Sequence, residues 1–124
     1  MYFNNQAIII GSTQKESADV LQIVFPKNTI FHADNLLELQ QILKAEGNST
    51  GLIILEDSIT IEPIGQVITG IRETYRLPIV AALTNPNPKT VGNAILSGAN
   101  GIIRGQIVDT HEIFDAVNDA LLAY

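Results

Sequence analysis

Short aliphatic runs alternate with helix-patterned segments along the whole chain. The apolar runs occupy residues 7–10, 29–33, 52–55, 77–83 and 102–103. The run at 52–55 lacks polar alternation, which is typical of a strand that is buried on both faces of a parallel sheet. The run at 29–33 is less apolar and indicates an edge strand. Apolar positions with helical spacing follow the five runs, within residues 18–25, 36–43, 67–75, 91–96 and 113–121.

Strands that alternate with helices imply a parallel sheet with right-handed crossovers and helices on both faces. We therefore predict an α/β fold of the doubly wound, flavodoxin-like (βα)5 type. Neither a linker nor an internal repeat divides the sequence, so residues 1–124 are expected to form a single domain.

Capping chemistry marks several of the expected helix starts. Residues 13–16 have the T-x-x-E form of a capping box. Asp34 and Asn35 can cap the second helix, and Asp109 or Thr110 the last one. In that last helix, Phe114 is assigned to the core together with the apolar positions around it.

Two consecutive carboxylates end the most apolar run. Glu56 and Asp57 directly follow residues 52–55, at the carboxyl end of the predicted strand. Open α/β sheets bind their ligands at this edge, so the segment predicts a functional site. The alternative is that both residues are ordinary polar strand-end residues that cap the next helix.

Composition narrows the classes of function. The chain is 46% hydrophobic and 16% charged, with a net charge of −6 and only seven basic residues, which argues against direct binding to nucleic acid. It has no cysteine, and its two histidines are far apart, so no metal cluster is expected. No run is long enough to span a bilayer. We therefore expect a cytoplasmic protein. Since no Ser-His-Asp order or cysteine nucleophile is present either, we also expect that the protein is not an enzyme.

Five local motifs, in order and at matching spacings, resemble the receiver domain of response regulators (CheY-like). They are the sequences ADN at 33–35, LIILE at 52–56, IR at 71–72, LPIVAALT at 77–84 and GANG at 98–101. The resemblance implies a five-stranded sheet of order 2-1-3-4-5 with a phosphoacceptor at the end of the third strand. It also implies that Thr84, 28 residues after Glu56, is the switch residue.

The register of the phosphoacceptor position has two solutions. The strand motif aligns Glu56 with the acceptor aspartate, whereas a shift by one residue places Asp57 there. Gly65 lies eight residues after Asp57, which matches the family's spacing from acceptor to glycine. In the first register, Glu56 is a candidate mimic of the phosphorylated state with Thr84 as its hydrogen-bond partner.

The chain departs from the receiver pattern at the positions that carry the chemistry. The two acidic residues expected after the first strand are replaced by Gly11 and Ser12, and the lysine after the fifth strand is replaced by Gly105. Arg104, next to it, is a candidate replacement for the lysine. Mg²⁺ needs carboxylate oxygens, and losing one electrostatic contact to a transferring phosphoryl group costs about 3 kcal/mol. We therefore predict a degenerate pseudo-receiver without standard Mg²⁺-dependent aspartate phosphorylation, with no cofactor and at most weak Mg²⁺ binding.

The resemblance also implies a protein partner, such as a histidine kinase or an output domain. In receivers the partner surface corresponds to residues 88–124 here, and a homodimer through the same surface is compatible with it. The expected fourth helix contains Gly92, which weakens it intrinsically. The exposed candidates on this surface are Lys89, Asn93, Arg104, Glu112, Asp115 and Asp119.

Two other functions stay open from the sequence. In the first, Asp57 is a true phosphoacceptor with reduced metal dependence. In the second, the chain binds a small ligand such as FMN, because residues 10–13 resemble the start of a flavin phosphate loop, although the loop's later glycine and second threonine are missing.

Overall fold

A five-stranded parallel sheet forms the centre of the protein, with strand order β2-β1-β3-β4-β5. The computed structural model describes residues 6–124. Its strands are β1 (Ala7–Gly11), β2 (Ile30–Ala33), β3 (Thr50–Glu56), β4 (Ile79–Leu83) and β5 (Gly101–Arg104). The predicted fold class, strand order and edge position of the second strand are confirmed.

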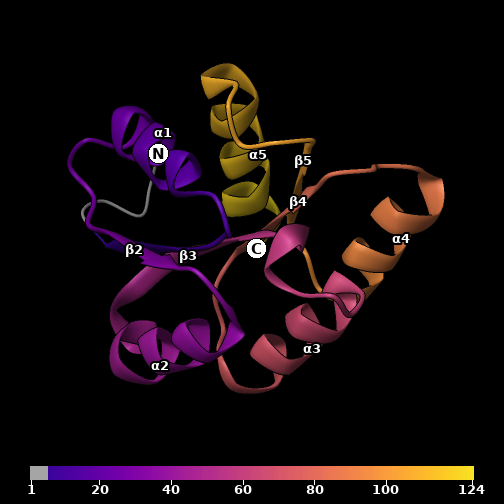
Figure 1. Cartoon of the computed structure of the whole chain (residues 1–124), viewed down its shortest axis with the longest axis horizontal. Coiled ribbons are helices and arrows are strands. Elements are labelled where there is room, and N and C mark those ends of the chain that lie inside the picture. The colour runs from indigo at the N-terminus through magenta and orange to yellow at the C-terminus, as the bar shows by residue number, and fades with distance from the viewer. Residues whose placement is uncertain (1–5) are drawn as a thin grey trace.

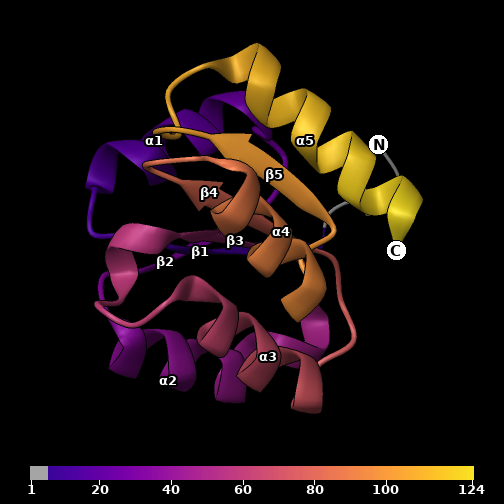
Figure 2. The same cartoon turned by 90° about the vertical axis from the view of Figure 1, so that its right-hand side faces the viewer.

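Helices cover both faces of this sheet (Figures 1 and 2). The helices are α1 (Lys15–Val24), α2 (Leu36–Glu46), α3 (Ile64–Thr74), α4 (Pro88–Ser97) and α5 (Thr110–Ala123). Figure 2 shows α1 and α5 on one side of the sheet and α2 and α3 on the other. The short 3₁₀ turns η1 (Gly47–Ser49) and η2 (Asp57–Ile59) flank β3. None of the described helices has the length and apolar character needed to cross a membrane.

Alternation along the strands divides the core in two. On the central strand, Leu52 and Ile54 face α1 and α5, whereas Ile53 and Leu55 face α2 and α3. All seven residues of β3 are buried. Burying one large aliphatic side chain contributes about 1.5–3 kcal/mol, so a strand of this composition is stable only at the centre of the sheet.

The observed helix starts confirm some of the expected caps and correct one. Asn35 accepts a hydrogen bond from Glu38 N at 2.9 Å, and Asp109 caps α5 through His111 N at 2.9 Å. The capping box expected at residues 13–16 is wrong, because α1 begins after Gln14 and has no side-chain cap. The Ser12 hydroxyl accepts from Gln14 N at 2.9 Å instead, so the strand end shapes the helix start.

The assignment of Phe114 to the core is also wrong. Its side chain is 44% exposed. The buried stripe of α5 consists of Ile113, Ala116, Val117 and Ala120, and it fills the space above the sheet. Phe114 lies beside that stripe, on the outward side of the helix.

Arg72 connects α3 to the loops that precede β4 and β5. Its Nη1 donates to Leu77 O at 2.6 Å, and its Nη2 donates to Gly98 O at 2.7 Å and to the side chain of Asn100. The guanidinium also lies 5.4 Å from the ring centre of Tyr124. Burial lowers the pKa of Arg72, and the nearby Tyr124 acts in the opposite direction. One side chain therefore joins three segments at the amino end of the sheet.

We expect the Arg72→Ala substitution to destabilise the protein by about 2 kcal/mol, because it leaves partly buried carbonyl groups without their charged donor. The free energy of unfolding in urea measures the effect. Arg76→Ala is the matched control, since Arg76 is exposed near the end of the same helix, and it should change the stability by less than about 0.5 kcal/mol. Equal effects of the two substitutions would contradict a role for the Arg72 contacts.

Candidate functional site

Glu56 ends the central strand with a buried carboxylate. Its side chain is 5% exposed. Because side chains alternate along a strand, Glu56 lies on the same face as Leu52 and Ile54, toward α1 and α5. Asp57 follows in η2 and is only half-buried, so the two neighbouring carboxylates have different surroundings.

Three donors surround the Glu56 carboxylate. Its Oε1 accepts a hydrogen bond from the Ser12 hydroxyl. Its Oε2 accepts from the Ser17 hydroxyl at 3.3 Å and from Ile107 N at 3.4 Å. These donors come from the segment after β1, from α1 and from the segment after β5. A buried carboxylate is tolerated only where such donors replace water, so this network joins three segments of the carboxyl edge.

Asp57 and Thr84 form a second, separate contact at the same edge. Asp57 Oδ2 accepts from Thr84 N at 3.0 Å, and Asp57 Oδ1 accepts from the Thr84 hydroxyl. The contact joins η2 to the segment after β4. The hypothesis that Thr84 is the hydrogen-bond partner of Glu56 is therefore wrong, because Thr84 binds Asp57 while Glu56 points toward α1 and the segment after β5.

Glycines occupy two positions where the receiver pattern has charged residues. Gly11 stands in place of an acid and Gly105 in place of the lysine. A Cβ atom on Gly11 would lie 2.7 Å from Ile59 Cδ1. Gly105 has a φ of +104°, a conformation that residues with side chains rarely adopt. Arg104 is exposed, and its backbone N donates to Glu112 Oε1 at 2.6 Å. A side chain at position 11 would have to displace the end of the Ile59 side chain, and a residue other than glycine at position 105 would strain the backbone.

The residues at this edge do not fit a magnesium site. Both oxygens of Glu56 and both oxygens of Asp57 already accept hydrogen bonds from the protein. Gly11 and Ser12 supply no carboxylate. Across residues 6–124, no group of three or more acidic or histidine side chains is placed to hold a metal ion. Mg²⁺ sheds its water reluctantly and would have to displace these donors.

The candidate partner residues divide between two places. Lys89 is exposed in the first turn of α4, and Asn93 lies further along that helix, in a depression between α3 and α4. On α5, Asp115 Oδ2 lies 3.4 Å from His111 Nε2. A shallow depression of about 370 Å³ beside β5 is lined by four of the candidates, Arg104, Glu112, Asp115 and Asp119.

Two partners of Glu56, Ser17 and Ile107, were not predicted from the sequence. Ser17 is buried on α1, four residues before Leu21 in the same buried stripe. A small polar residue within an apolar stripe is the signal that identifies it. Ile107 contributes its backbone amide, and no side-chain pattern reveals such a donor.

No protein-family model matches the chain, and no curated protein matches it. Solved structures do match over almost the full length. A response regulator from Thermotoga maritima superposes with a TM-score of 0.82, at 14% identity over 95% of this chain and 98% of that one. The chain has the fold of a receiver domain.

Two further structures with the receiver fold show the same similarity. The signal receiver domain of an HD domain-containing protein from Pseudomonas fluorescens has a TM-score of 0.78, at 18% identity and 96% coverage of both chains. The beryllofluoride-activated NtrC4 receiver domain, described as a dimer, has a TM-score of 0.78, at 12% identity over 95% of this chain and 98% of that one. At these identities the similarity concerns the fold.

We expect Ser17→Ala to lower the free energy of unfolding by about 1–2 kcal/mol, because it removes a donor from a buried carboxylate. Urea denaturation measures the effect. Ser58→Ala is the control, since Ser58 is exposed beside the same site and should change the stability by less than about 0.5 kcal/mol.

A double-mutant cycle identifies the cause of that effect. In a Glu56→Leu background the cost of Ser17→Ala should disappear, since the acceptor is gone. An unchanged cost in that background would show that Ser17 stabilises α1 by other means.

Proposed function

We propose that this protein is a receiver-like module of two-component or phosphorelay signal transduction that acts through protein–protein contacts without Mg²⁺-dependent aspartate phosphorylation. The observation that carries the proposal is the burial of Glu56, whose carboxylate is held by Ser12, Ser17 and Ile107. In this proposal Glu56 occupies the phosphoacceptor position. The hydrogen-bond donors to Glu56 then hold together the segments after β1, β3 and β5. In a working receiver a metal ion and a phosphoryl group hold these segments together.

The surroundings of Glu56 support the absence of phosphoryl transfer. A phosphoryl group needs an accessible oxygen and cations that neutralise its charge. Glu56 is buried. Gly11 at an acid position and Gly105 at the lysine position carry no charge. Each missing electrostatic contact costs about 3 kcal/mol in the transition state, and several are missing together.

The proposed partner is another protein, such as a histidine kinase or an output domain. The depression beside β5, lined by Arg104 and the acidic residues of α5, supports contact with a basic surface by charge complementarity. The NtrC4 receiver with the same fold is described as a dimer. By analogy, we propose the surface of α4, β5 and α5 as the site of either the partner or a second copy of this chain.

Asp57 defines the second candidate function, a phosphorylatable receiver. It is more exposed than Glu56 and lies against Thr84, as a phosphoacceptor beside a switch residue would. The third function, binding of FMN, is disfavoured by the contact between the Ser12 hydroxyl and Glu56. That contact places a carboxylate beside the loop that would bind the flavin phosphate, and the two negative charges would repel each other.

An amide NMR titration with Mg²⁺, followed by Mg²⁺ with beryllofluoride, tests the proposal. We expect no specific shifts at residues 56–58, 84 and 104–105 at millimolar Mg²⁺, because the carboxylates already accept hydrogen bonds. A receiver that has both acids and the lysine serves as the positive control for the reagent.

The Asp57→Ala variant distinguishes the two candidates in the same titration. Shifts in the native protein that vanish in this variant would overturn the proposal and assign a phosphoacceptor role to Asp57. Shifts that persist in Asp57→Ala and vanish in Glu56→Gln would overturn it in favour of Glu56 as an active acceptor.

A further inference from the structure

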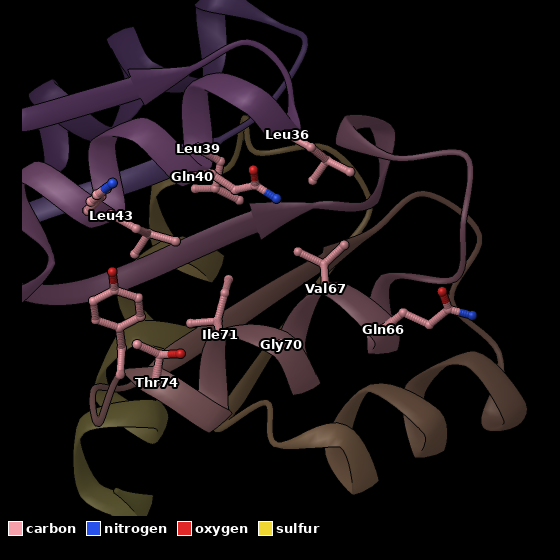
Figure 3. A pocket seen from close by; sticks show the side chains of 11 residues that line it. Leu36, Leu39, Gln40, Leu43, Gln66, Val67, Gly70, Ile71 and Thr74 are labelled. Atoms are coloured by element: carbon pink, nitrogen blue, oxygen red, sulfur yellow. The ribbon is translucent and has the colours of Figure 1, made fainter.

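A groove between α2 and α3 takes no part in the carboxylate network. Its volume is about 430 Å³, which lies within the range of small-molecule sites. Figure 3 shows that side chains from both helices border it. It is lined by Leu36, Leu39, Gln40, Leu43, Lys44, Gln66, Val67, Gly70, Ile71, Thr74 and Tyr75.

The interior of the groove is apolar. Leu39, Leu43 and Ile71 belong to the buried core on this face of the sheet, and Leu36 and Val67 pack against that core while staying partly exposed. In Figure 3, Val67 and Ile71 extend from α3 toward α2. An aliphatic chain in this groove would therefore bury apolar surface on both helices, at about 25 cal/mol per Å².

Gly70 keeps the α3 wall of the groove low. A glycine within a helix costs about 1 kcal/mol relative to alanine. A Cβ atom at Gly70 would meet nothing within 4 Å, so no contact within the described residues requires glycine there. Glycine at such a position allows a ligand to approach the helix backbone closely.

Lys44 gives the groove its charge. It is the one charged side chain among the groove's described lining residues, in a chain with 13 acidic and seven basic residues. Among residues 6–124, no ion pair involves Lys44. Its neighbours one helical turn away, Gln40 and Gln41, are uncharged. An ammonium group at the edge of an apolar groove favours a ligand with one negative charge.

We propose that the groove between α2 and α3 binds an amphiphilic monocarboxylate, with its aliphatic chain against the partly exposed Leu36 and Val67 and its carboxylate at Lys44. Affinity requires both contacts together, because neither the exposed charge nor the open apolar surface binds tightly alone. This ligand site goes beyond the proposed signalling function and does not depend on it.

Amide NMR titration of the full chain with decanoate, below its micelle concentration, tests the proposal. We expect saturable shifts at Leu39, Leu43, Gly70 and Ile71. Decanol, which has the same chain length without the charge, should bind roughly tenfold more weakly, which corresponds to about 1.4 kcal/mol.

Substitutions on the two sides of the proposed contact complete the test. Lys44→Ala should weaken decanoate binding roughly tenfold, whereas Lys89→Ala, the same change on α4, should leave it unchanged. Val67→Trp should abolish binding by filling the groove, and a thermal unfolding curve checks that this variant is folded.

Three outcomes would overturn the assignment. Shifts that never saturate, or equal binding of decanoate and decanol that Lys44→Ala leaves unchanged, would indicate unspecific contact with apolar surface. Shifts at the groove that grow with protein concentration alone would assign it to a second copy of the chain. The beryllofluoride titration reports on residues 56–58, which lie outside the groove, so the two proposals fail separately.

Discussion

The arrangement of the carboxyl edge depends on one constraint, the need of the buried Glu56 carboxylate for hydrogen-bond donors. An unpaired carboxylate in an aliphatic core costs several kcal/mol. Glu56 avoids that cost only because Ser12, Ser17 and Ile107 are brought to it from three segments. The positions of the β1–α1 loop, of α1 and of the β5–α5 loop are therefore linked to one side chain at the end of the central strand.

The same hydrogen bonds support the proposal that this receiver-like fold acts without metal-assisted phosphorylation. Metal-assisted phosphoryl transfer needs free carboxylate oxygens and a cation at the strand ends. In this protein the carboxylate oxygens accept protein donors, and Gly105 adopts a backbone conformation that suits glycine. The hydrogen-bonded network and a magnesium site would compete for the same oxygens.

A charged, partly or fully buried side chain connects segments at each end of the sheet. Arg72 joins α3 to the loops before β4 and β5, and Glu56 joins β3 to the segments after β1 and β5. The depression beside β5 and the groove between α2 and α3 lie away from these two networks, and their charged lining residues are mainly acidic in the first and a single lysine in the second.

The sequence by itself determined the order of the elements, the parallel sheet and its edge strand, because apolar periodicity and caps such as Asn35 act over a few residues. It also placed both carboxylates at the carboxyl edge. Only the tertiary structure decided which groups they bind, since the donors to Glu56 lie 39 to 51 residues away and one is a backbone amide. The exposure of Phe114 depended on how α5 packs on the sheet, which local patterns do not reveal, whereas the start of α1 was set by the nearby contact between Ser12 and Gln14.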